Sequence, residues 1–255
     1  MTPLRTRLAA AALGTGLVIA APAAAWAGPL RPVSAPTSAS ENPTDATRRS
    51  IDDLRARCLA AIDVRLPALA SARSAVSGND HVTDDHQVAL VEDIDQTAAR
   101  LRDLATLIQA DTDLATLKDH CRSIFEDNRV FALVLPRVRL VVGSDTATDA
   151  GAMLKDIAGK LADAIARAEA AGQDVHQAKL DLDMMKAQIA SGVAAAGTVP
   201  GAVLSLTPAD WNANHDVLTP ARQSLRSARA DLRVARDLAH KIRNELRPQP
   251  ASPQV

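Results

Sequence analysis

The chain has 255 residues, a formal net charge of −1 and an apolar content of 47%, of which alanine supplies a large share, whereas aromatic residues make up only 2%. The near-neutral charge gives no indication of a nucleic-acid partner. Because large aromatic rings supply much of the buried area in ordinary cores, a core of Ala, Leu, Val and Ile instead suits closely packed helices.

Residues 1–27 have the pattern of a secretory signal peptide. Two early arginines are followed by an apolar run over residues 8–21, and Ala25-Trp26-Ala27 forms an A-x-A cleavage site. The alternative is an uncleaved membrane anchor. The run is near the lower length limit for a membrane span and Pro22 interrupts it, which favours cleavage. We therefore expect the mature chain to begin at Gly28, to have no transmembrane segment, and to be secreted, extracellular or cell-wall associated.

Three further regions follow the signal peptide. Residues 28–46 are rich in Pro, Ser and Ala without an apolar period, which predicts a flexible leader. Residues 47–246 carry helical periodicity throughout and are predicted to form a helical bundle domain. Residues 247–255 are predicted to be a disordered tail.

The two cysteines, Cys58 and Cys121, are predicted to form one disulfide bond. Cysteines of exported proteins meet an oxidising compartment, where a pair of them usually joins. Both fall on apolar helical faces, and their heights differ by only about one turn if the first and third helices run parallel. The alternative is two buried thiols.

Apolar residues at alternating steps of three and four predict long helices with a heptad pattern. The expected helices span about residues 47–76, 83–110, 114–142, 150–171, 174–195 and 207–246. In the second helix the apolar face comprises Leu90, Ile94, Thr97, Leu101, Leu104 and Ile108. The fold class predicted from this pattern is all-α: an elongated bundle of about six long antiparallel helices.

The third expected helix contains the most apolar segment of the domain. Residues 130–142 are apolar on nearly every face, and a helix of this kind is covered on all sides. We expect Phe131 to fill a central position, and Asn128 on the apolar face to fix the register of the helices. Residues 143–149 and 197–206 are expected to be loops.

Proline is expected to kink three helices. Pro67, Pro136 and Pro220 fall inside the predicted helices, where each removes one backbone hydrogen bond.

Two segments resemble a functionally uncharacterised group of exported actinobacterial helical-bundle proteins. They are CRSIFEDNRVFALVLPRVRLVV, residues 121–142, and LSLTPADWN, residues 204–212. The resemblance extends over most of the mature chain. It implies a helical, exported protein and supplies no active-site residue.

The last predicted helix carries a row of arginines, each directly after an apolar position. This arginine stripe consists of Arg222, Arg226, Arg229, Arg233, Arg236 and Arg243, and His240 and Arg247 continue its spacing. One interpretation is a bundle edge whose arginines pair with acidic residues of the second helix, such as Glu92, Asp93 and Asp95. The other is a surface for an anionic polymer, such as a phosphate polymer of the cell envelope.

The sequence shows no catalytic motif. It has no G-x-S-x-G, no H-E-x-x-H and no glycine-rich phosphate loop, so we expect a protein that is not an enzyme. His81 and His86 lie near Asp84 and Asp85, but their spacing matches no metal-ligand motif. Asp145 and Asp149 lack the further oxygen ligands of a calcium loop. We expect no metal and no cofactor.

The function predicted from these features is surface interaction in or outside the cell envelope by a non-enzymatic exported bundle. The partner would be an unknown protein or a cell-envelope polymer, and the arginine stripe is the candidate surface for an anionic polymer if it is not a bundle edge. The alternative function is a carrier that holds an apolar, lipid-like ligand between kinked helices.

Overall fold

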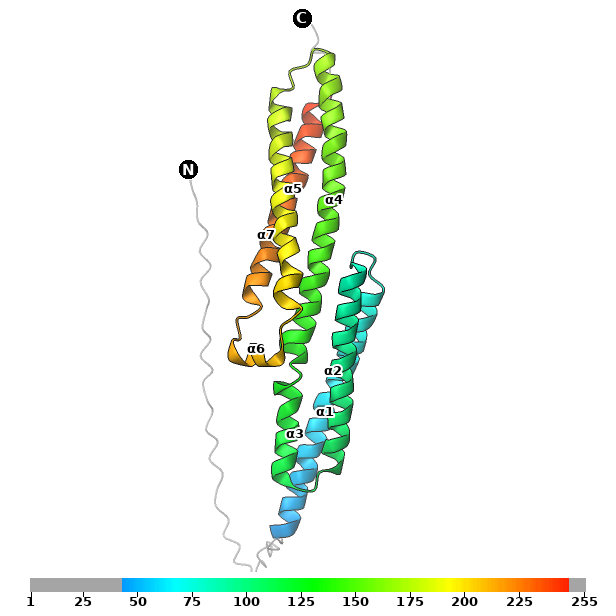
Figure 1. The fold of residues 1–255 in the computed structure, drawn as a ribbon, viewed down its shortest axis with the longest axis vertical. Coiled ribbons are helices and arrows are strands. Elements are labelled where there is room, and N and C mark those ends of the chain that lie inside the picture. The colour runs from blue at the N-terminus through cyan, green and yellow to red at the C-terminus, as the bar shows by residue number, and fades with distance from the viewer. Residues whose placement is uncertain (1–42, 248–255) are drawn as a thin grey trace, which may run out of the picture. The chain divides into compact units, whose positions relative to one another are not determined.

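The computed structural model describes residues 43–247, which are helical throughout apart from short connections and contain no strand. The elements, drawn in Figure 1, are α1 (Pro43–Ser77), α2 (Asp84–Ala110), α3 (Leu114–Glu126), the π-helical turn η1 (Val130–Val134), α4 (Leu135–Ala170), α5 (His176–Val203), α6 (Pro208–Ala213) and α7 (Thr219–Glu245). The prediction of an all-α bundle is confirmed.

Several sequence predictions fall on residues that the structure does not describe. The signal peptide over residues 1–27 and its cleavage site lie outside the described residues, as do most of the leader and residues 248–255 of the tail. Helix α1 begins at Pro43, so the domain starts four residues earlier than the predicted position at residue 47.

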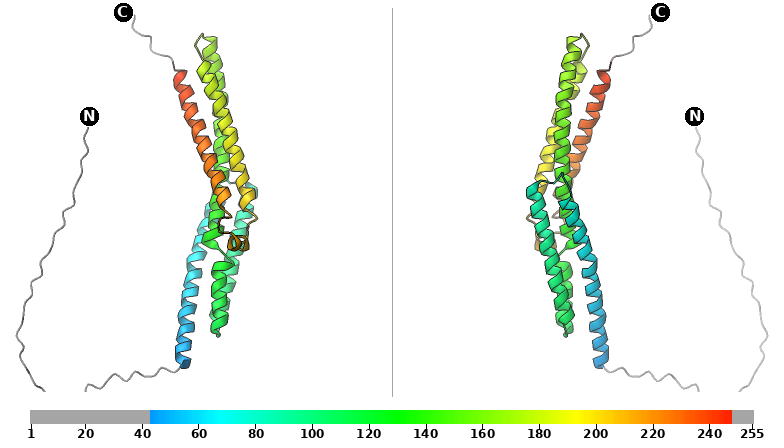
Figure 2. Two further views of the ribbon diagram at one scale, coloured as in Figure 1. Left: turned by 90° about the vertical axis from the view of Figure 1, so that its left-hand side faces the viewer. Right: turned by 90° about the vertical axis from the view of Figure 1, so that its right-hand side faces the viewer.

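The helices pack in two groups around one continuous set of buried apolar residues. Helices α1, α2 and α3 pack on one another, and α5 packs against both α4 and α7, as Figures 1 and 2 show. The turn η1 contacts α2, and α4 contacts α1, so these elements join the groups.

Helix α2 follows its sequence pattern closely. Thr83 caps its first turn by accepting a hydrogen bond from the backbone N–H of His86, and two aspartates follow where the helix dipole favours negative charge. Every residue of the predicted apolar face is buried: Leu90, Ile94, Thr97, Leu101, Leu104 and Ile108.

A disulfide bond joins Cys58 of α1 to Cys121 of α3, with 5.6 Å between the two Cα atoms. Both residues are buried. The predicted bridge is therefore confirmed. No helix between residues 43 and 247 combines the length and apolar character that crossing a bilayer would require.

The predicted third helix is interrupted after Glu126. Arg129 adopts a left-handed backbone conformation with φ of 39°, and a π-helical turn follows it. Asn128 is buried and donates a side-chain hydrogen bond to the carbonyl of Ser123, which also accepts from the backbone N–H of Asp127 at the end of α3. The interruption escaped the sequence analysis because the apolar spacing continues in phase on both sides of it.

The predicted central position of Phe131 is wrong. Its side chain is 49% exposed, whereas Leu133 is fully buried and Val130 nearly so. The backbone N–H of Leu135 bonds to the carbonyl of Val130, five residues earlier, so this turn is wider than an α-helical one. The wider turn changes which residues face the core, and it leaves Phe131 at the surface.

Two predicted loops are helical instead. Residues 143–149 lie inside α4, and residues 197–203 lie inside α5 with Pro200 among them. In α4, two of the small residues that suggested a loop lie at close contacts between helices. A side-chain carbon at Gly143 would lie 3.0 Å from Leu225 on α7, and buried Ser144 donates a hydrogen bond to the carbonyl of Ala196 on α5.

The predicted last helix is two helices. Thr207 and Asp210 form a capping box that starts α6, and the chain leaves helical structure after Ala213 before α7 begins. Pro220 lies in the first turn of α7, where the missing N–H costs no hydrogen bond, so it does not kink that helix from within. Pro136 is the second residue of α4 and follows directly on the π-helical turn η1. Pro67 does lie inside α1.

A buried arginine ties the two helix groups together. The Nη1 atom of Arg137 on α4 lies 2.7 Å from a carboxylate oxygen of Asp93 on α2, and its Nη2 donates to the carbonyl of Leu206. The side chain of Arg137 is only 5% exposed. A buried charge is tolerated where it is paired in this way.

Candidate anion-binding surface

Helix α7 presents the arginine stripe beside its buried face. The core side of the helix packs on α5 and α4 and comprises Ala221, Leu225, Ala228, Leu232, Ala235 and Ile242. Most arginines of the stripe directly follow one of these residues. They therefore lie at the border of the packed face, from which a long side chain reaches solvent.

The arginines of the stripe have few partners. Arg222 is half-buried, and the other five are exposed. The nearest carboxylate is that of Asp237, 3.4 Å from Arg236 and adjacent to it in the chain, while Arg243 contacts His240. Among residues 43–247, no carboxylate of another helix lies within ion-pair distance of the stripe.

The predicted pairing of the stripe with acidic residues of the second helix is wrong. Helix α2 packs on α1 and α3, whereas α7 packs on α5 and α4. Two of the carboxylates proposed as partners bind elsewhere: Asp93 pairs with Arg137, and Asp95 pairs with Arg73 at 2.9 Å. The acidic face of α2 therefore does not neutralise α7.

Lys241 lies on the same helix as the arginine stripe but has a carboxylate partner on a neighbouring helix. Its amino group lies 2.6 Å from Asp181 of α5, whose side chain is fully buried. This hydrogen bond is the main reason that the pKa of Lys241 lies above its ordinary value, and nearby Glu245 adds to the effect. The arginines of the stripe have no equivalent carboxylate on α5.

A fourth arginine joins three arginines of the stripe around one depression. Arg139 on α4 lines a hollow of about 330 Å³ together with Arg222, Arg226 and Arg229, over Leu140 and Leu225. We call this site the arginine hollow. Arg139 could not be assigned to this site from the sequence, because a helical period does not show that α4 lies beside α7.

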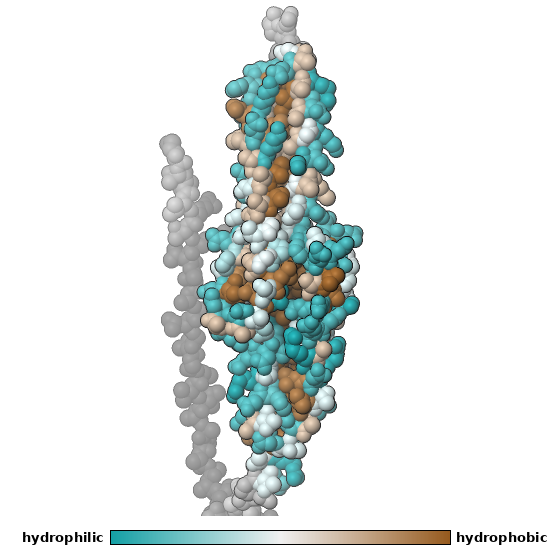
Figure 3. Space-filling view, in the orientation of Figure 1, coloured by the Kyte–Doolittle hydropathy of each residue, from teal (hydrophilic) through white to brown (hydrophobic). Residues whose placement is uncertain are grey.

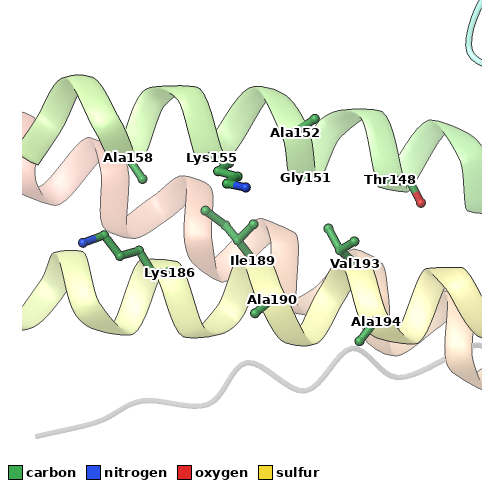
Figure 4. A pocket seen from close by; sticks show the side chains of 10 residues that line it. All are labelled: Thr148, Gly151, Ala152, Lys155, Ala158, Lys186, Ile189, Ala190, Val193 and Ala194. Atoms are coloured by element: carbon green, nitrogen blue, oxygen red, sulfur yellow. The ribbon is translucent and has the colours of Figure 1, made fainter.

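An apolar groove lies between α4 and α5. It has a volume of about 550 Å³ and is lined mainly by small and apolar side chains, with Lys155 and Lys186 along it. Figure 4 shows Ile189 and Val193 of α5 between the two helices, facing Gly151 and Ala158 of α4. In Figure 3 a narrow line of hydrophobic residues runs along this part of the molecule between hydrophilic flanks.

The histidines and aspartates considered for metal binding form two separate pairs. His81 lies 2.9 Å from Asp149, and His86 lies 2.9 Å from Asp145, which also accepts from the backbone N–H of Thr83. These contacts fasten the turn between α1 and α2 to α4. In the part of the chain that the structure describes, no three His, Cys, Asp or Glu residues are grouped to hold a metal ion.

Comparison with known proteins adds no relative from which a site could be carried over. Models of protein families, curated proteins and solved structures were all compared with the chain, and none matches it.

Proposed function

We propose that this is an exported, non-enzymatic helical-bundle protein that binds an anionic polymer of the cell envelope through the arginine stripe of α7. The observation that carries the proposal is a row of exposed guanidinium groups without carboxylates from neighbouring helices. The signal-peptide pattern and the disulfide bond support a location outside the cytoplasm.

The spacing of the stripe suits a long ligand better than a single small ion. Its arginines recur every three, four or seven residues along α7. Like charges at such spacing on one helix repel one another, and binding of a polyanion relieves this repulsion along the whole row. Guanidinium groups also bind phosphate oxygens in a bidentate way, which favours a polymer of phosphate esters.

The experiment compares two variants that lose the same charge. The stripe variant replaces four exposed arginines with glutamine: Arg226, Arg229, Arg233 and Arg236. The control variant makes four such replacements at exposed positions outside α7: Arg57, Arg102, Lys118 and Lys160. Each protein is sedimented with isolated cell walls, and the bound fraction is measured at increasing salt.

We expect the parent and the control variant to sediment with the walls and the stripe variant to remain in solution. Binding by the parent should weaken steeply with salt, because exposed charges are screened over about 8 Å at physiological ionic strength. Equal sedimentation of the stripe and control variants would contradict the proposal.

The groove between α4 and α5 supports a second candidate function, transport of an apolar ligand. Its lining is largely apolar, and its volume of about 550 Å³ is that of a small-molecule site. The lysines along it would suit an acyl chain with an anionic end. None of the prolines that were predicted to kink helices lines this groove.

Dodecanoate is a suitable probe of this carrier function. Replacing Ala190, which lines the groove, by Phe should fill the groove and abolish binding measured by calorimetry. Ala187→Phe adds the same ring at an exposed position of α5 that does not line the groove, so this variant should bind as the parent does. Unchanged dodecanoate binding by the Ala190 variant would exclude the groove.

A further inference from the structure

The arginine hollow brings together cations from two helices that are far apart in the sequence. Arg139 belongs to α4, and the other three arginines belong to the first turns of α7. Since α4 packs against α7, these side chains converge on one depression rather than spreading along one helix. A bundle edge needs no such convergence.

The hollow contains donors and no acceptor with negative charge. Its lining is four arginines and two leucines, and among residues 43–247 no carboxylate lies within ion-pair distance of Arg139, Arg222, Arg226 or Arg229. Leu140 and Leu225, which are both buried, form the apolar part of the lining.

Arg229 lies close to the backbone of α4. A side-chain carbon at residue 143 would lie 2.7 Å from a terminal nitrogen of Arg229, so the guanidinium group passes directly over Gly143. Arg226 is also oriented, since its Nε donates to the carbonyl of Arg222.

We propose that the arginine hollow is a discrete site for a diphosphate group, two phosphoryl units joined by one bridging oxygen. This inference deepens the proposed function, on which it rests for the anionic nature of the ligand. Beyond the polymer-binding stripe, the inference assigns a separate site that binds one diphosphate group per chain, and it includes Arg139 of α4, which is not part of the stripe.

The size of the hollow and its four positive charges favour a diphosphate ligand over a single phosphate ion. Four guanidinium groups offer more donors than the oxygens of one phosphate can accept, since each guanidinium carries five N–H donors. A volume of about 330 Å³ is at the lower end for small-molecule sites, which suits a compact ligand. Arginine is the residue best suited to grip phosphoryl oxygens in pairs.

Isothermal titration of the full chain with inorganic pyrophosphate, at low salt and without divalent metal, tests the proposal. We expect saturable binding at one pyrophosphate per chain, tighter than binding of orthophosphate. The variants Arg139→Gln and Arg222→Gln should each weaken it about tenfold or more, as loss of a charge-assisted hydrogen bond does.

Arg57→Gln and Arg102→Gln are the matched controls, since each removes one exposed charge that belongs neither to the hollow nor to the arginine stripe. Both should bind pyrophosphate nearly as the parent does. An equal loss in these controls and in Arg139→Gln would overturn the proposal, because it would show a response to net charge only. Absence of one-to-one binding by the parent would overturn it as well.

The two proposals can fail separately. One-to-one pyrophosphate binding by a protein that does not sediment with cell walls would remove the polymer function and leave the diphosphate site. Sedimentation that needs the stripe, by a protein without saturable pyrophosphate binding, would remove the diphosphate site and leave the polymer function.

Discussion

The Cys58–Cys121 bridge closes a segment of 63 residues that contains all of α2. In the chain-entropy model a loop of this length stabilises the folded state by about 3–5 kcal/mol. We expect a reducing agent, or the double Cys→Ser variant, to lower the melting temperature while helical circular dichroism persists at room temperature. Two free thiols titrated in the unfolded, unreduced protein would contradict the bridge.

Leu133 and Phe131 lie two residues apart and differ in burial. Leu133 is fully buried, so Leu133→Ala should cost about 2–5 kcal/mol of unfolding free energy. Phe131 is half exposed and contacts Arg65 across its ring, so Phe131→Ala should cost less than about 1 kcal/mol. Urea unfolding of both variants measures the difference. A larger loss for Phe131→Ala would contradict the burial found in η1.

The Lys241–Asp181 pair should make stability depend on pH in the alkaline range. The pKa of Lys241 is raised by its hydrogen bond to Asp181, so the folded state holds the proton more tightly than the unfolded state. The stabilisation is complete below the unfolded pKa of about 10.4 and is lost as the pH rises through the folded value. Thermal unfolding of Lys241→Gln should thus differ from the parent at neutral pH and converge with it at high pH.

At the scale of elements, the start of α4 depends on the buried Arg137. Arg137→Gln leaves Asp93 and the carbonyl of Leu206 without their partner. Since the side chain of Asp93 is 27% exposed and water can reach it, we expect a loss of about 1–3 kcal/mol of unfolding free energy. Arg139→Gln, two residues further on and exposed, should change stability by no more than about 0.5 kcal/mol. Chemical denaturation of both variants measures the contrast. Equal stability would show that Arg137 does not join the helix groups.

The helical faces could be predicted from the sequence where one period runs without interruption. The apolar face of α2 is buried throughout, since alternating steps of three and four leave only one side for the core. The break near Arg129 and the continuity of α4 through Gly143 could not be predicted. Both depend on packing between elements, in which a glycine can mark a close contact instead of a loop.

The candidate site was visible in the sequence only in part. The arginine stripe follows from the period of one helix. The helices that lie beside the stripe could not be predicted, because heptad spacing does not show which helix packs next to α7. The acidic residues of α2 were therefore assigned to it wrongly, and Arg139 was not found.

At the scale of the whole molecule, positive charge is left uncompensated on one helix while acidic groups are used in another part of the fold. Asp93 and Asp95 of α2 bind Arg137 and Arg73. Among residues 43–247, Asp237 carries the only carboxylate within ion-pair distance of the arginine stripe. This separation of charge within a nearly neutral chain is the reason to expect an external anion at α7.

The most direct test of this account is an NMR titration that observes the Nε–Hε group of each arginine while long-chain polyphosphate is added. We predict that the signals of Arg226, Arg229, Arg233 and Arg236 shift together and return when salt is added. The signals of Arg73 and Arg137, which are already paired with carboxylates, should stay in place. Shifts of similar size at all arginines, or none on α7, would contradict the central claim that the stripe binds an anionic polymer.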